Sequence, residues 1–165
     1  MALHFSKQEF EKRKIAILNS MKEQNLDALL MFRQESMFWL TGYDTFGYVF
    51  FQTLIIDQKG NIILLTRAPD LRQAQNTSNI EDIRIWVDKD QSNPTDDLKI
   101  ILNELNLKGK RIGIEYEAYG MTGRNALKLN KSLKDYCEVE DQSELITKHR
   151  VIKSTEEIVY VKRAA

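Results

Sequence analysis

The chain has 165 residues, of which 42% are hydrophobic and 29% charged, and its 24 basic side chains balance 24 acidic ones. This length suits one globular domain, and a formal net charge of zero argues against a nucleic-acid surface, which is usually strongly basic. No apolar run reaches the ~18 residues that cross a bilayer, the N-terminus lacks the apolar core of a signal peptide, and a single cysteine permits no internal disulfide. We therefore expect a cytoplasmic protein that binds neither nucleic acid nor membrane.

The first half of the chain is predicted to form a helix followed by buried strands. Ser6 and Glu9 have the spacing of a capping box at the start of that helix. Its apolar stripe consists of Phe10, Ile17, Leu18 and Met21. Apolar runs predict strands at 28–32, 49–57 and 62–66. Gly60 allows a tight turn between the last two strands, which therefore form an antiparallel hairpin.

Helices and strands alternate in the second half. The predicted strands are 83–87, 111–116 and 138–139. The predicted helices are 70–75, 94–105, which has Pro94 in its first turn, and 121–133, which has Thr122 as a candidate cap. This alternation predicts an α/β fold, and the hairpin makes its core a mixed β-sheet flanked by helices.

Residue types that carry out catalysis or bind metals occur singly in this sequence. His4 and His149 have no second histidine or carboxylate at metal-ligand spacing, and no serine lies in a G-x-S-x-G turn. Cys137 has no histidine near it in sequence. We therefore predict no catalytic residue and no metal ligand in this chain. The histidines are expected to be solvated, and the cysteine to be a small buried hydrophobe.

Seven aromatic residues lie within positions 38–51, where the chain becomes rich in glycine and irregular. Three of them are expected to pack in the core, namely Phe38, Phe50 and Phe51. Phe46 and Tyr48 fall in an irregular segment next to a strand, where large aromatic side chains on a loop make good anchors for a ligand or a partner. The candidate rim residues of a substrate site are Tyr43, Asp44, Phe46 and Tyr48, with Gly47 providing conformational freedom. The alternative is that Phe46 and Tyr48 cover the edge of the sheet.

A further helix is predicted near the end of the chain, because Ser154 and Glu157 form a second capping box ahead of the apolar residues Ile158 and Val161. The segment resembles a junction of the creatinase/prolidase family of Xaa-Pro peptidases, in which Arg-x-Ile-Lys-Ser-x-x-Glu-Ile leads from a small N-terminal domain into the catalytic domain. The matching residues are Arg150, Ile152, Lys153, Ser154, Glu157 and Ile158. Two other stretches are similar to family signatures: FWLTGYD resembles Tyr-Leu-Thr-Gly-Phe, and RIGIEY resembles an Ile-Gly-hydrophobic-Glu strand.

The resemblance implies that residues 1–150 form the family's N-terminal domain, with a ribonuclease H-like motif. Residues 151–165 would then be the linker and the start of the first helix of a catalytic domain that is absent from this sequence. That domain would bind two divalent ions (manganese, cobalt or zinc). The N-terminal domain would be non-catalytic, would gate the active site, and would contribute to a homodimer.

The family includes enzymes that cleave small amides instead of peptides. By this resemblance, Phe46, Gly47 and Tyr48 fall where creatinase has a Phe-Gly-Arg sequence, which it presents to its partner's active site. Tyrosine cannot pair with a carboxylate as a guanidinium does, which disfavours creatine. The expected substrates are Xaa-Pro peptides, and the alternatives are the same domain of a creatinase- or ectoine-hydrolase-like amidohydrolase, or a free-standing α/β binding or dimerisation module.

Overall fold

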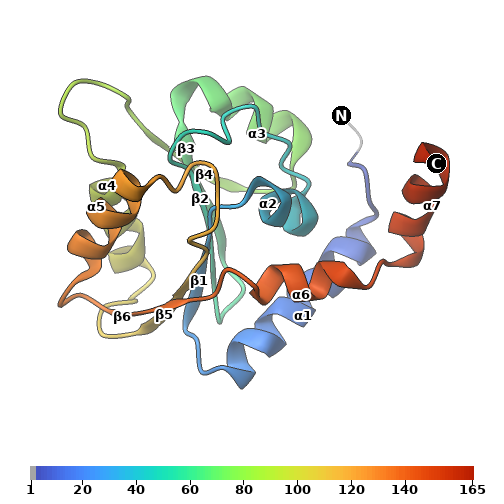
Figure 1. The fold of residues 1–165 in the computed structure, drawn as a ribbon, viewed down its shortest axis with the longest axis horizontal. Coiled ribbons are helices and arrows are strands. Elements are labelled where there is room, and N and C mark those ends of the chain that lie inside the picture. The colour runs from blue at the N-terminus through green and yellow to red at the C-terminus, as the bar shows by residue number, and fades with distance from the viewer. Residues whose placement is uncertain (1–2) are drawn as a thin grey trace.

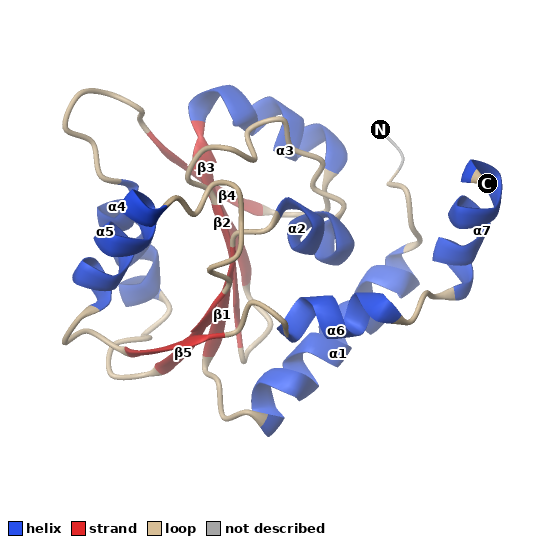
Figure 2. Ribbon diagram, in the orientation of Figure 1, coloured by secondary structure: helices blue, strands red, loops and turns tan. Residues whose placement is uncertain are grey.

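The computed structural model describes residues 3–165 and places a mixed six-stranded sheet between two layers of helices (Figures 1 and 2). The strands are β1 (Ala28–Met31), β2 (Thr53–Asp57), β3 (Ile62–Arg67), β4 (Asp82–Trp86), β5 (Arg111–Ile114) and β6 (Glu138–Asp141). Their order across the sheet is β4-β3-β2-β1-β5-β6. Strand β2 runs antiparallel to both of its neighbours, and the other pairs are parallel. The predicted fold class is therefore confirmed.

Helices cover both faces of the sheet, which Figure 1 shows nearly edge-on. The covering helices are α1 (Lys7–Glu23), α2 (Gln34–Thr41), α3 (Leu71–Thr77), α4 (Pro94–Glu104), α5 (Gly123–Leu133) and α6 (Leu145–Val151), whereas α7 (Thr155–Ala164) buries no residue on the domain. Apolar side chains of α4 and α5 pack on one face, and those of α1, α2, α3 and α6 pack on the other. All four residues of β1 are fully buried, as expected for a central strand covered on both sides. Among the described residues, no helix is both long and apolar enough to cross a membrane.

The hairpin and the caps form largely where local signals predict them. Gly60 has φ of 83° in the turn between β2 and β3, and Thr122 accepts a hydrogen bond from the Asn125 backbone N–H at the start of α5. Ser154 and Glu157 make both bonds of the predicted capping box. At α1 only half of the box forms, because Ser6 accepts from the Glu9 backbone whereas the Glu9 carboxylate accepts from Arg13 instead.

Three segments differ from the sequence-based expectation. Residues 49–52 are not part of β2, which begins at Thr53, because the Gln52 side chain enters a buried polar network at the end of the sheet. Helix α2 was not expected, since its N-cap residue, Arg33, makes no side-chain capping bond and the helix therefore lacks a local start signal. Helix α6 is a short additional helix before the C-terminal segment.

Candidate functional site

The loops at one end of the sheet carry most of the side chains predicted to form the site. Strands β1, β3 and β5 are mutually parallel, and their carboxyl ends meet at the end of the sheet where β2 begins. The segment 42–52 between α2 and β2, the segment 67–70 after β3, and the segment 115–120 after β5 therefore lie at the same end. In open α/β sheets, ligands bind at the carboxyl ends of the strands.

A buried polar network fixes the first of these loops to the sheet. Tyr43 is fully buried, and its hydroxyl donates to the Gln52 side-chain oxygen (3.0 Å). The Thr66 hydroxyl donates to the same oxygen (3.2 Å), and the Gln52 amide donates to the Thr45 hydroxyl (3.2 Å). Burial raises the pKa of Tyr43, so its hydroxyl stays protonated and remains a donor. Of the four candidate rim residues, Tyr43 thus lies in the core and anchors the loop.

Close packing at Gly47 fixes the middle of the loop. A Cβ atom at this position would lie 2.6 Å from both carboxylate oxygens of Asp70, so a larger residue here would require the Asp70 side chain to move. Asp70 accepts from Arg67 Nε (3.0 Å), and the Arg67 guanidinium lies 3.4 Å from the centroid of the Phe50 ring. Gly47 therefore allows a close approach to the Asp70 carboxylate, and it has no positive φ that would need the expected conformational freedom. Phe50, which was expected in the core, is 42% exposed beneath this guanidinium.

The loop displays two of its aromatic side chains to solvent. Phe46 is 86% exposed and Tyr48 is 36% exposed. The Tyr48 ring meets the ring of Tyr119 edge-on at 5.6 Å, and Tyr119 is itself 71% exposed. We call Phe46, Tyr48 and Tyr119 the aromatic patch. Tyr119 was not predicted. Like Phe46, it directly precedes a glycine: Phe46 lies in the loop before β2, and Tyr119 lies in the loop after β5. Asp44, the fourth candidate, is exposed, and its backbone N–H donates to the Thr77 hydroxyl (3.2 Å).

Two hollows lie beside this loop region and share Glu35 and Arg150 in their linings. One, of about 490 Å³, lies between the N-terminal segment and α2, and Asp44 and Tyr43 contribute to it. The other, of about 560 Å³, is lined by Arg33 and residues 116–119. Phe46 and Tyr48 line neither hollow, so the structure brings Asp44 to a concave surface and leaves these two aromatic side chains projecting.

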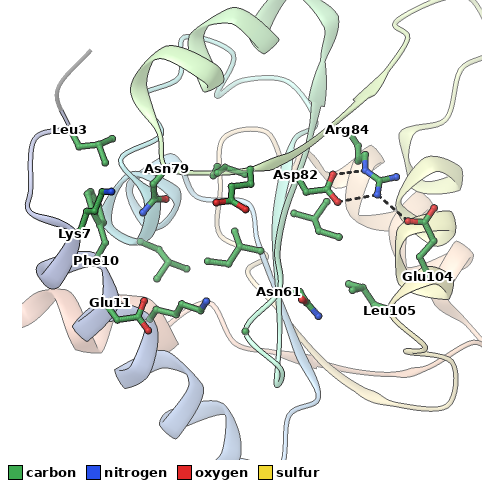
Figure 3. A pocket seen from close by; sticks show the side chains of 17 residues that line it. Leu3, Lys7, Phe10, Glu11, Asn61, Asn79, Asp82, Arg84, Glu104 and Leu105 are labelled. Carbon is green, nitrogen blue, oxygen red and sulfur yellow. Dashed lines mark hydrogen bonds and ion pairs between the residues drawn. The ribbon is translucent and has the colours of Figure 1, made fainter.

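A third hollow, of about 770 Å³, lies between α1 and the β3–β4 side of the sheet (Figure 3). Charged side chains surround it, and Arg84 pairs there with both Asp82 and Glu104. None of the candidate rim residues reaches it. Because its charges are of both signs and its arginine is already paired, this hollow favours no ligand of a particular charge. The loop region is therefore the better candidate site.

Glu115 supports the loop region from inside the domain. Its carboxylate is fully buried at the end of β5 and accepts from the backbone N–H groups of Phe32 and Arg33 (both 3.0 Å) and from the Ser36 hydroxyl (2.6 Å). It therefore caps α2 from a distant part of the chain. Burial raises the pKa of Glu115 to about 7, although the three donors act in the opposite direction. The family-like RIGIEY stretch contains this residue, but its capping role was not predicted.

The histidines and the cysteine differ from each other in environment. His4 is exposed as expected, whereas His149 is half-buried against Trp39, with Nε2 2.9 Å from the Ser20 hydroxyl. Burial lowers the pKa of His149. Cys137 is half-buried, and burial raises the pKa of its thiol to about 11, which makes it a poor nucleophile at neutral pH. Across residues 3–165, no three His, Cys, Asp or Glu side chains are placed to hold a metal ion.

The geometry defines an α/β sandwich whose projecting aromatic side chains gather on loops at the carboxyl ends of parallel strands. The chain belongs to the creatinase/prolidase family: the pattern of the Creatinase/Prolidase N-terminal domain matches residues 13–152. The similarity suggested by the junction segment and by the strand signatures is thus confirmed at the level of the family.

Two curated relatives extend well beyond this chain. An uncharacterized hydrolase/peptidase, y4tM, of Sinorhizobium fredii is 28% identical over 169 residues, covering 98% of this chain and 43% of the relative. The ectoine hydrolase of Halomonas elongata is 25% identical over 171 residues, covering 99% of this chain and 43% of the relative. The chain therefore spans less than half the length of these relatives.

Solved structures share the fold at low sequence identity. A prolidase from Thermococcus sibiricus superposes with a TM-score of 0.79 at 20% identity, covering 97% of this chain and 42% of that one. An Xaa-Pro aminopeptidase chain from Streptococcus pyogenes superposes with a TM-score of 0.69 at 19% identity, covering 87% of this chain and 98% of that one. A solved chain of about this length therefore adopts this fold.

Proposed function

We propose that this chain is the non-catalytic N-terminal domain of a cytoplasmic, metal-dependent hydrolase of Xaa-Pro peptides, and that its aromatic patch forms part of the rim of an active site completed by another domain. The observation that carries the proposal is the display of Phe46, which is 86% exposed on a loop held by the buried contacts of Tyr43 and Gly47. A rigid loop loses little entropy when a ligand or a partner binds it. An exposed aromatic side chain on such a loop suits a binding role better than a packing role.

A catalytic half would supply the chemistry. In the proposed enzyme two manganese, cobalt or zinc ions in that half would activate a bridging water for hydrolysis. The residues of this chain would limit access to the site and contact the part of the substrate that is not cleaved. The names of its structural neighbours, a prolidase and an Xaa-Pro aminopeptidase, support peptides that contain proline as the substrate class.

The surface around α7 supports attachment to a further domain. Val151 and Ile152, just before α7, are 66% and 84% exposed, and Ile158 and Val161 on the helix are 39% and 52% exposed. Several exposed apolar side chains within one short segment are typical of a contact with another protein surface. We propose that the catalytic half covers it, and that the aromatic patch faces the cleft of the second subunit of a homodimer.

Hydrolysis of a small amide is the second candidate, because one curated relative is an ectoine hydrolase of which this chain matches 43%. The two candidates differ in the substrate that the rim would meet. A peptide offers apolar side chains to Phe46 and Tyr48, whereas a compact amide offers mainly its ring and its charges. A free-standing binding module, without any catalytic half, is the third candidate.

The first prediction tests the reaction itself. The full-length protein is expected to hydrolyse Xaa-Pro dipeptides in the presence of Mn²⁺, Co²⁺ or Zn²⁺, and the 165-residue chain alone is expected to be inactive with the same metals. Product formation is measured for a panel of Xaa-Pro dipeptides, creatine and ectoine. Turnover of ectoine without turnover of any dipeptide would select the amide candidate, and a gene that encodes no catalytic half would select the binding module.

The second prediction concerns the rim. Phe46→Ala in the full-length enzyme is expected to change the free energy of unfolding by less than about 0.5 kcal/mol, because the side chain is mostly solvated. It is expected to raise KM by about three- to tenfold with little change in kcat, because a rim residue contributes binding more than chemistry. Thermal unfolding and steady-state kinetics give the two values.

Leu127→Ala is the matched control for this substitution. Leu127 is 74% exposed on α5, which packs on the sheet through other residues, so its removal deletes exposed apolar surface away from the loop. It is expected to leave both stability and KM unchanged. A collapse of the melting temperature of Phe46→Ala, with normal kcat/KM for the folded fraction, would show that Phe46 packs in the full-length protein and does not form a rim.

A further inference from the structure

Helix α7 projects from the body of the domain, yet its first turns meet the residues that precede α1 (Figure 1). The Glu156 carboxylate accepts hydrogen bonds from the Ser6 backbone N–H (2.9 Å) and from the Ser6 hydroxyl (2.6 Å). One turn further along, the Tyr160 hydroxyl donates to the His4 carbonyl oxygen (2.7 Å). The Tyr160 ring also meets the Phe5 ring edge-on at 5.4 Å. These contacts join the two ends of the described chain.

A buried cation lies behind these contacts. Arg13 is 3% exposed, and it donates from Nε to the Glu9 carboxylate (3.0 Å) and from Nη1 to the Trp39 carbonyl oxygen (2.7 Å). Its Nη2 lies 3.4 Å from the Glu157 carboxylate of α7, and its guanidinium lies 4.1 Å from the centroid of the Phe5 ring. Arg13 therefore links α1, α2 and the first turn of α7. Nη2 makes no hydrogen bond to the described residues, so its contact with Glu157 is an ion pair that helps to neutralise the buried guanidinium.

Apart from these contacts, α7 buries little of its surface on this domain. Ile158, Val159 and Val161 are between 39% and 52% exposed, and no residue of α7 is buried. A helix of ten residues is marginal in water when it has no apolar face to bury. What orders α7 on this domain is therefore the set of polar and aromatic contacts at its first two turns, together with its own capping box.

We propose that Ser6, Glu156 and Tyr160, backed by the pair Arg13–Glu157, form a clasp that fixes the orientation of α7 on the domain. The consequence rests on the function proposed above: because α7 would begin the first helix of the catalytic half, the clasp sets how that half is aligned with the aromatic patch. The two donors from Ser6 lower the pKa of Glu156, as expected for a carboxylate that accepts both hydrogen bonds in its charged form. Glu156 and Tyr160 are positioning residues, since neither touches the rim.

Amide hydrogen exchange of the 165-residue chain tests the clasp without any catalysis. The chain has its own core on both faces of the sheet, and a solved chain of about this length has the same fold, so it is expected to fold alone. Glu156→Ala is expected to accelerate exchange of residues 158–164 by about three- to tenfold, because it removes two hydrogen bonds to a charged group. Tyr160→Phe is expected to have a smaller effect in the same direction. Exchange in the strands is expected to stay unchanged in both variants.

Two controls separate the clasp from general effects of charge. Asp97→Ala also removes an acidic residue from the first turn of a helix, α4, and is expected to leave exchange in α7 unchanged. Glu156→Gln retains one acceptor oxygen for the two Ser6 donors and loses the charge, so it is expected to restore only part of the protection. Equal exchange of α7 in Glu156→Ala and in Asp97→Ala would overturn the clasp, and so would exchange in the wild-type chain as fast as in a synthetic peptide of residues 151–165.

The hydrogen-exchange experiment tests the clasp and the substrate panel tests the proposed function, and the two results are independent. If α7 loses protection in Glu156→Ala while no substrate is hydrolysed by the full-length protein, the clasp stands and the proposed function is wrong. If substrates are hydrolysed while the exchange rate of α7 is unchanged by these substitutions, the function stands and the clasp is wrong.

Discussion

Glu115→Ala is expected to lower the free energy of unfolding by about 3–5 kcal/mol, because it leaves two buried backbone N–H groups and one hydroxyl without their acceptor. These donors belong to Phe32, Arg33 and Ser36, so the start of α2 loses its cap. Arg33 also ties this region to Glu117 and Thr147 through its guanidinium, and its position is expected to become less defined. Chemical denaturation at pH 5.5 measures the change.

Glu115→Gln is the matched variant, because its amide oxygen can accept from both backbone groups and its nitrogen can donate to Ser36. It also provides a pH test. The pKa of Glu115 is raised to about 7 in the fold from an ordinary value of 4.5, so the folded state favours the protonated form. The stability from this group is therefore fully present below pH 4.5 and is lost as the pH rises through about 7.

The stability difference between wild type and Glu115→Gln is expected to shift by about 3 kcal/mol in favour of the glutamine variant between pH 4.5 and pH 8. Glutamine has no proton to lose, so its own stability does not follow this transition. A difference that stays constant over this range would mean that the fold does not raise the pKa of Glu115, with its three donors offsetting its burial.

Gly120→Ala is expected to lower the free energy of unfolding by about 3 kcal/mol and to displace the aromatic patch. A Cβ atom at Gly120 would lie 2.3 Å from the Phe50 carbonyl oxygen and 3.0 Å from the Tyr48 carbonyl oxygen, so the backbone of one loop must move. Tyr48 and Tyr119, whose rings are in contact, lie on the two loops that approach each other here, so this contact is expected to change. In the full-length enzyme the variant is therefore expected to lose rim binding as well, seen as a higher KM in the folded fraction.

Gly123→Ala, three residues along, is the control for Gly120→Ala. No heavy atom lies within 4 Å of a Cβ at Gly123, which begins α5, and alanine favours a helix more than glycine does. Its free energy of unfolding is expected to stay the same or to rise by up to about 1 kcal/mol. Equal stability of the two variants would show that the loops around Gly120 are loose enough to absorb a methyl group.

The sequence by itself determined the elements that depend on neighbouring residues. The capping box of Ser154 and Glu157, the cap at Thr122 and the turn at Gly60 each act within four positions along the chain, so their residue types are enough to predict them. Apolar runs placed the strands for a similar reason, since a central strand needs apolar residues on both of its faces. With the family motifs, these local signals were sufficient for the fold class.

Only the tertiary structure decided which aromatic residues are displayed and what supports them. Tyr43 and Phe46 are three positions apart and similar in sequence terms, yet one is fully buried and the other 86% exposed, because Gln52 and Thr66 from the sheet hold the Tyr43 hydroxyl. Helix α2 takes its cap from Glu115, about 80 positions further along the chain. Contacts of this kind depend on how distant segments pack together, and no local residue pattern encodes that packing.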